Sequence, residues 1–228
     1  MFGSPLRRVA TCESTQLLLG PGDPEGAVVV ADFQTAGRGR LGRTWTAPPG
    51  TAVLCSVLLR PPAGGRIAQL SLVAGLATAQ TVEAALGRPA QLKWPNDVLV
   101  DGLKVAGVLA EARDGIVVVG VGLNVNQTAA ELPGDARIAA ASLRSLDGSE
   151  RDREALLADL LVRLESAYGS WLADRLGALH GEIASRDALA GRAVSVGGRS
   201  GRALGIDRDG RLVLDSGPVE SGEVTLVS

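Results

Sequence analysis

The 228-residue sequence predicts an α+β fold, in which a mixed sheet is flanked by helices and a small β-barrel follows. Three observations support this prediction. Continuous apolar runs, such as residues 26–32, are typical of buried strands. A longer apolar stretch over residues 66–86 is typical of a helix buried against a sheet. Near the C-terminus, short β-like pieces alternate with regularly spaced turns.

The composition limits the kinds of function that the chain can have. Apolar residues make up 46%, charged residues 21%, and the net charge is -2, so the chain as a whole has no electrostatic reason to coat nucleic acid. His180 is the only histidine, which argues against histidine metal clusters and Ser-His-Asp catalysis. Two isolated cysteines, Cys12 and Cys55, fit free thiols in a reducing compartment. Without a signal-peptide pattern or an uninterrupted membrane span, we expect a cytoplasmic protein.

The first half of the chain begins with a short helix, for which Ser14 and Thr15 are candidate caps. A buried strand over residues 26–32 and a second one over 52–60 follow. The helix over 66–86 is expected to end at Gly87, because glycine readily adopts the left-handed conformation after a helix.

A kink and a hairpin are expected next. Pro95 cannot sit inside a paired strand, so the chain must bend there before a new strand and a tight turn at Asp101-Gly102. The hairpin returns over 104–111, and residues 116–126 form another apolar strand.

Residues 127–148 are expected to be an irregular connection. Ser149 and Asp152 then open a long amphipathic helix in which Trp171 is core packing. The composition changes near Gly191, and the chain continues as short pieces at 193–196, 202–207, 211–215 and 224–227. We therefore expect one domain over 1–186 and a small β-domain over 187–228.

The stretch A-G-R-G-R-L-G-R-T-W, residues 36–45, follows a predicted strand. Glycines let the backbone approach a ligand closely, and arginine forks match phosphate and carboxylate oxygens. The stretch therefore predicts a loop that closes around an anionic small molecule. The other interpretation is a flexible arginine-glycine segment that contacts RNA or lies in solvent.

A second polar cluster contains Lys93, Asn96 and Asp97, with Lys104 across the hairpin. One carboxylate and one amide beside cationic side chains suit magnesium that is bound largely through phosphates. The plainer alternative is a capped turn between strands. No G-K-[ST] follows the loop glycines, and G-V-G-L-N at 120–124 lacks the third glycine of a dinucleotide fingerprint.

Taken together, these motifs resemble the biotin protein ligases. The resemblance rests on G-R-G-R-L-G-R-T-W at 37–45 and K-W-P-N-D-V-L-V at 93–100. K-V-A-G-V-L-A-E at 104–111 and G-V-G-L-N-V at 120–125 extend it in the same order. It implies the biotin/lipoate ligase catalytic fold, similar to class II synthetases, with an SH3-like C-terminal barrel.

The resemblance also implies a two-step reaction. The biotin carboxylate would attack the α-phosphate of ATP to give biotinyl-5′-AMP and pyrophosphate, and a lysine of a biotin carboxyl carrier domain would then take the biotin. ATP, Mg²⁺ and biotin are the expected small molecules. Both steps can depend on positioning and charge stabilisation alone.

The family's site residues carry over by motif. The biotin contacts fall on Ser14, Thr15, Gln34, Arg38, Gly39, Arg40 and Lys104. Arg38, Arg40 and Lys104 would be the catalytic residues. Arg40, Trp45, Asn96 and Asn124 would contact ATP, with Asn96 and Asp97 organising magnesium. Trp45 is expected to pack against adenine from an exposed loop, whereas strand packing explains Lys93 and Trp94 equally well.

The sequence departs from the family at Gln16, where asparagine is usual, and only a few residues precede Ser14. We therefore expect a single-function ligase without a DNA-binding domain, present as a monomer or homodimer with no membrane partner. A lipoate or other acyl ligase on the same fold is the main alternative. A nucleic-acid-binding module based on the R-G-R segment is a second alternative, but it lacks interleaved aromatic residues.

Overall fold

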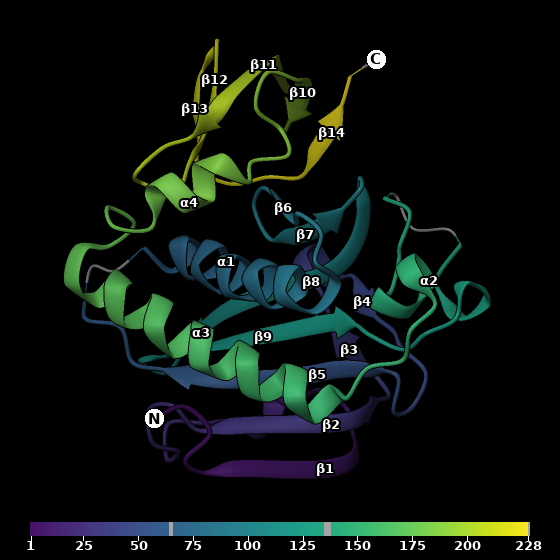
Figure 1. The fold of residues 1–228 in the computed structure, drawn as a ribbon. Helices are drawn as coiled ribbons and strands as arrows, with labels where there is room; N and C mark the ends of the chain where they lie inside the picture. Colours follow the sequence, from purple (N-terminus) through teal and green to yellow (C-terminus); the bar gives the residue numbers. More distant parts are fainter. Residues whose placement is uncertain (64–65, 135–137, 228) are drawn as a thin grey trace.

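A seven-stranded mixed sheet lies at the centre of the computed structural model, which describes residues 1–63, 66–134 and 138–227 (Figure 1). The strand order is β1-β2-β5-β9-β8-β7-β6, and only β1 and β2 pair in parallel. The strands are β1 (Leu6–Cys12), β2 (Val28–Gln34), β5 (Ala52–Leu59), β6 (Gln91–Lys93), β7 (Asp97–Val100), β8 (Leu103–Arg113) and β9 (Ile116–Asn124). This sheet confirms the α+β class that the sequence predicts.

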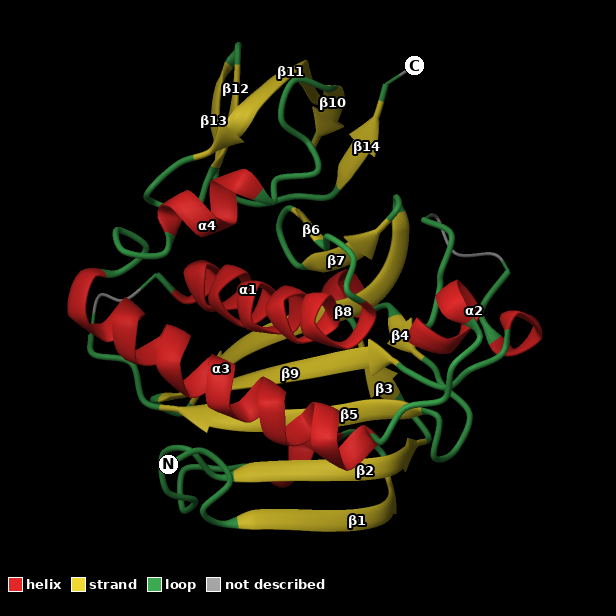
Figure 2. Ribbon diagram, viewed as in Figure 1, coloured by secondary structure: helices red, strands yellow, loops and turns green. Residues whose placement is uncertain are grey.

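Two long helices cover one face of the sheet, as Figure 2 shows. The helix α1 (Ile67–Leu86) ends at Gly87, which is left-handed as expected. The helix α3 (Arg153–Asp174) begins at Asp152, whose side chain accepts hydrogen bonds from two backbone N–H groups of the first turn. Trp171 is fully buried and its indole N–H donates to Gln69 of α1, so the prediction of core packing is confirmed.

The strands β5 and β9 present different residues to their two faces, because side chains alternate along a strand. Val53 and Val57 join the core under the helices. On the opposite face Ser56 pairs with Gly120, and the neighbouring pair joins Leu54 to Gly122. Since two of these four positions are glycine, few side chains of β5 and β9 project from this area of the far face.

Smaller elements connect these strands. Near the N-terminus lie the 3₁₀ helix η1 (Thr15–Leu18), the two-stranded ribbon β3 (Gly37–Arg38) and β4 (Thr44–Trp45), and the turn η2 (Arg40–Gly42) between them. The later ones are η3 (Ala129–Glu131), α2 (Leu143–Asp147) and α4 (His180–Ser185). Residues 135–137 of the expected irregular connection lie outside the described residues. Among the described helices, none is long and apolar enough to cross a membrane.

The C-terminal residues form a five-stranded antiparallel sheet with order β13-β12-β11-β10-β14. Its strands are β10 (Ala193–Val196), β11 (Arg199–Ile206), β12 (Leu212–Leu214), β13 (Gly217–Val219) and β14 (Val224–Leu226). A turn at Asp215-Ser216 joins β12 to β13, and Gly217 follows it with a φ of 110°. The strand β13 is not among the short pieces expected from the sequence, and it accommodates Pro218 because it is an edge strand. The expected division at 186/187 falls in the segment after α4, where Leu92 of β6 hydrogen-bonds to the residues on both sides of Asp187.

Two further expectations differ from the structure. The strand β1 was not predicted, because it contains the exposed residues Arg7 and Arg8 and its sequence is not a continuous apolar run. Ser14 does not cap η1 through its side chain. Its hydroxyl is buried without a hydrogen-bond partner, so the interpretation of Ser14 as a helix cap is wrong.

Candidate active site

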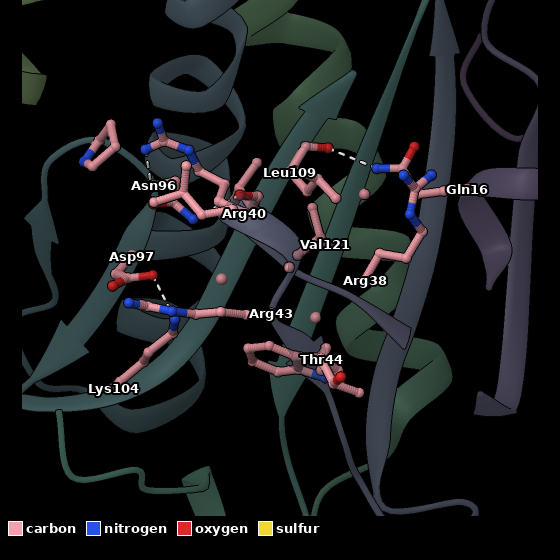
Figure 3. A pocket seen from close by; sticks show the side chains of 18 of the residues that line it. Gln16, Arg38, Arg40, Arg43, Thr44, Asn96, Asp97, Lys104, Leu109 and Val121 are labelled. Atoms are coloured by element: carbon pink, nitrogen blue, oxygen red, sulfur yellow. Dashed lines mark hydrogen bonds and ion pairs between the residues drawn. The ribbon is translucent and has the colours of Figure 1, made fainter. Parts of the chain in front are cut away.

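A cavity lies over the glycine-rich face of the sheet, between the arginine loop (residues 37–43) and the turn of residues 93–97 (Figure 3). Residues from β2, β5, β7, β8 and β9 border it, and so do three residues of the C-terminal domain. The candidate residues that line it are Ser14, Thr15, Gln34, Arg38, Gly39, Arg40, Trp45, Asn96, Asp97 and Lys104. The structure therefore brings together motifs that lie up to 90 positions apart.

Three glycines form the floor of the cavity. Gly107 of β8 pairs with Gly122 of β9, and the indole of Trp45 lies over both. A Cβ on Gly107 would come within 3.0 Å of Trp45 Cζ3, and one on Gly122 would overlap its indole ring. Gly120 is covered in the same way by Gln16, whose Nε2 would lie 2.8 Å from an added Cβ. Any side chain at these positions would occupy the space that the Trp45 indole and the Gln16 side chain now fill.

One end of the cavity, here called the neutral end, consists of Ser14, Thr15, Gln34 and Ser56. The Thr15 hydroxyl lies 2.8 Å from Ser56 Oγ and 3.1 Å from Gln34 Oε1, which also accepts a hydrogen bond from Thr15 N at 2.7 Å. The Ser14 hydroxyl is buried without a partner. None of these four side chains is charged, and the hydrogen bonds from Thr15 fix the Gln34 amide before any ligand arrives.

Gln16 borders the same end and is almost fully buried. Its Nε2 donates to the Leu109 carbonyl at 2.8 Å, while Oε1 is buried without a partner. Cys55 also borders the cavity, and burial raises the pKa of its thiol to about 12. Both groups therefore remain neutral at physiological pH.

The opposite end, here called the charged end, consists of Arg40, Asn96, Asp97 and Lys104. Lys104 Nζ lies 2.6 Å from Asp97 Oδ1 and 5.7 Å from the centre of the Trp45 ring. Arg40 Nη1 donates to Asn96 Oδ1 at 3.5 Å. Burial lowers the pKa of Arg40, although Asp97 and Glu223 oppose this effect by favouring the charged form. Arginine stays protonated in either case, so this end holds two partly buried cations.

The arginine loop is a tight ribbon that the sequence builds from glycines. Gly39 N donates to Arg43 O at 2.7 Å, and Leu41 and Gly42 have φ values of 58° and 73° at the tip. A Cβ at Gly37 would overlap the Trp45 carbonyl oxygen. The glycines thus allow the two strands of the ribbon to lie close together with three arginines projecting from them.

The arginines of this loop have different partners. Arg38 Nη1 lies 2.8 Å from Glu111 Oε2 at the edge of the cavity, away from Lys104 (Figure 3). Arg43 forms an ion pair with Glu223 of the C-terminal domain. Arg40 hydrogen-bonds to Asn96 of the charged end, and the Arg43 side chain extends towards Asp97 and Lys104 (Figure 3).

Asn124 is the one candidate residue that does not line the cavity. It is buried, its Nδ2 donates to the Ala141 carbonyl at 3.0 Å, and its Oδ1 accepts from Gln127 Nε2 at 3.0 Å. The structure gives it the role of holding the chain after β9. Trp45 differs from its expectation too, because its ring is partly buried on the glycine floor and is not on an exposed loop.

Sequence reasoning missed the contribution of the C-terminal domain. Gly222, Glu223 and Val224 border the cavity, and Glu223 is 180 positions away from Arg43. No local motif marks these three residues, and only the docking of the two domains brings them to the site.

Among the described residues, no three His, Cys, Asp or Glu side chains gather in a group that could hold a metal ion. Asp97 and Asn96 nevertheless supply one carboxylate and one amide beside the cavity. That donor set fits magnesium held mainly by phosphate oxygens and water, which needs only one or two carboxylates from the protein.

Comparison with known proteins identifies the family to which the chain belongs. The family model described as Biotin/lipoate A/B protein ligase family matches residues 12–127, just over half of the chain. The chain belongs to this family.

Its relatives include Bifunctional ligase/repressor BirA of Bacillus spizizenii, 35% identical over 209 residues. That alignment covers 85% of this chain and 62% of the relative, so the chain spans less than two thirds of that protein's length. Biotin--[acetyl-CoA-carboxylase] ligase of Paracoccus denitrificans is 37% identical, with 92% of both chains covered. The structure of the Aquifex aeolicus biotin protein ligase in complex with biotin and ATP superposes with a TM-score of 0.88, at 33% identity, covering 97% of this chain and 98% of that one.

Proposed function

We propose that the protein activates biotin with ATP to form biotinyl-5′-AMP and transfers the biotin to a lysine of a biotin carboxyl carrier domain. One observation carries this proposal: a single cavity has an uncharged hydrogen-bonding end and a cationic end, separated by a glycine floor. An elongated ligand with a polar neutral ring at one end and an anion at the other matches this arrangement. Biotin has a ureido ring and a carboxylate in these places.

The neutral end suits a ureido ring because it offers both donors and acceptors. The Ser14 hydroxyl and Gln16 Oε1 are buried without partners, and Gln34 is held by Thr15 through Oε1, which leaves its amide nitrogen to donate. Leaving such groups without partners costs about 1–3 kcal/mol each, so a ligand that satisfies them gains affinity and selectivity.

The charged end suits the first chemical step. A carboxylate oxygen of biotin forms a bond to the α-phosphorus of ATP, and the bond to pyrophosphate breaks. Arg40 and Lys104 would stabilise the charge that develops on the phosphate oxygens. For Lys104 to do so, its Nζ would turn from Asp97, 2.6 Å away, towards the phosphate. Arg38 would have to leave Glu111 to join them, and we therefore assign the phosphate clamp to Arg40 first.

The second step needs no covalent bond to the enzyme. The amine of the carrier lysine attacks the acyl carbon of the mixed anhydride, AMP leaves, and the amine nitrogen loses a proton. Lys104 would again lie beside the leaving phosphate. Trp45 would supply a flat apolar surface for the adenine, and Asn96 and Asp97 would hold magnesium, whose charge helps to neutralise the phosphates.

A lipoate ligase on the same fold is the second candidate. The dithiolane ring of lipoate has no N–H or carbonyl group, and it would leave the Ser14 hydroxyl and Gln16 Oε1 without partners at the neutral end. These polar groups favour biotin.

The test uses the whole chain with labelled biotin, ATP, magnesium and a biotin carboxyl carrier domain. We expect label on the carrier, none when the carrier lysine is replaced by arginine, and at least tenfold weaker binding of lipoate than of biotin by calorimetry. Tighter binding of lipoate, or no transfer of biotin, would contradict the proposal.

A further inference from the structure

The C-terminal domain closes one side of the cavity. The segment from Gly222 to Val224, which leads into β14, borders the same space as Lys93 and Asn96. This small domain is therefore part of the wall of the site, and its side chains are close enough to act on the arginine loop.

Glu223 is the charged residue of this segment, and it forms an ion pair with Arg43 at the end of the loop. The two side chains are 31% and 56% exposed, respectively, so the contact lies at the mouth of the cavity. Arg43 also anchors the ribbon through its backbone, since its carbonyl accepts from Gly39 and its N–H donates to Arg40 O at 3.2 Å. An interaction that holds the Arg43 side chain in place therefore also restrains the backbone on both sides of the loop tip.

The carboxylate of Glu223 also interacts electrostatically with Arg40. Burial lowers the pKa of Arg40, and the nearby carboxylates of Asp97 and Glu223 counteract that effect. The carboxylate of Glu223 therefore attracts Arg40 in addition to Arg43, with which it forms the ion pair.

Two hydrogen bonds hold the small domain, which carries Glu223, against residues 93 and 94. Trp94 Nε1, buried, donates to the Gly210 carbonyl at 2.9 Å, and Lys93 Nζ donates to the Val224 carbonyl at 3.3 Å. Both donors precede the turn that carries Asn96 and Asp97. The backbone beside Glu223 is therefore tied to the charged end of the cavity.

We propose that Glu223 is a positioning residue, which holds the arginine loop closed through Arg43 and so retains the adenylate until the carrier lysine arrives. This inference rests on the proposed function for the identity of the ligand, but the loop contact itself does not. An ion pair with this exposure shifts an equilibrium by only a few-fold. The predicted effect is correspondingly small, local and sensitive to salt.

The first test needs no ligand. Hydrogen exchange of the Gly39 and Arg43 amides is measured in the wild type and in Glu223→Gln, and we expect about two- to fivefold faster exchange in the variant. Glu220→Gln is the matched control, since Glu220 lies in the same domain and pairs with Arg66 and Arg211, away from the loop. Unchanged loop exchange in Glu223→Gln, or equally faster exchange throughout the small domain, would overturn the inference.

The second test exchanges the charges. Arg43→Glu and Glu223→Arg should each release adenylate about two- to fivefold faster than the wild type, and the double variant should recover most of the difference. If the double variant loses adenylate as fast as the singles, the pairing does not hold the loop. If the loop exchanges faster in Glu223→Gln but no biotinyl adenylate forms in the wild type, the proposed function fails while the positioning role stands.

Discussion

The two ends of the cavity are built from different interactions. The neutral end is held by hydrogen bonds among buried groups, with Thr15 fixing both Ser56 and Gln34. The charged end is held by ion pairs and one long hydrogen bond, Lys104 with Asp97 and Arg40 with Asn96. A ligand phosphate can replace the carboxylate partner of Lys104, whereas the hydrogen bonds of Thr15 join groups of the protein to one another. The difference supports the proposal that one end selects the substrate and the other end rearranges to perform the chemistry.

The largest effect should follow from removing a cation at the charged end. In Lys104→Ala we expect adenylation and transfer to slow by about 10²- to 10³-fold, because charge on the phosphate loses its partner. Biotin affinity should change by only a few-fold, because the neutral end is intact. Single-turnover measurements of each half-reaction check this. Activity within a few-fold of the wild type would remove Lys104 from the mechanism.

A side chain on the glycine floor should affect both ends at once. In Gly122→Val the new methyl groups would overlap the Trp45 indole and displace it over the cavity. We expect about tenfold or more weaker binding of biotin and of ATP, measured by calorimetry.

Gly169→Ala is the control for this floor variant, since Gly169 is exposed in α3 with open space around its Cα. It should bind as the wild type does, and its thermal stability should be equal or slightly higher. Wild-type binding by Gly122→Val would mean that the ligand does not lie on the floor.

The smallest effect that we predict is on the alkylation of the two cysteine thiols. Burial raises the pKa of Cys55 to about 12, so the thiol stays protonated as the pH rises from 7 to 9. The thiolate is the reactive form, and we expect alkylation of native Cys55 to be negligible over this range and slower than that of the half-exposed Cys12. Mass spectrometry after timed alkylation gives both rates. Rapid labelling of Cys55 that rises with pH would show that the core around this thiol opens to solvent.

Much of the fold could be predicted because its signals are local. The strand β5 is a continuous apolar run that is buried on both faces, and α1 ends at Gly87, as its sequence indicates. The edge strand β1 lacked such a signal, because Arg7 and Arg8 are both exposed, on opposite faces of the strand, and only one neighbouring strand pairs with it.

The site residues, too, could be predicted only where they lie in local sequence motifs. Arg40, Lys104 and Asp97 lie in recognisable motifs, and the structure brings them to one end of the cavity. Asn124 also lies in a motif, but its hydrogen bond to Ala141 depends on a connection that the sequence left irregular. Glu223 has no motif, because its role depends on how a separate domain docks.

The most direct test of the division between the two ends compares Thr15→Val with Lys104→Ala in one experiment. Biotin affinity and the single-turnover rate of adenylation at saturating biotin are measured for both variants. We predict that Thr15→Val loses about tenfold in affinity and keeps its rate within a few-fold, whereas Lys104→Ala keeps its affinity and loses the rate. If both variants lose affinity and rate in equal proportion, the two ends do not have separate tasks and the account is contradicted.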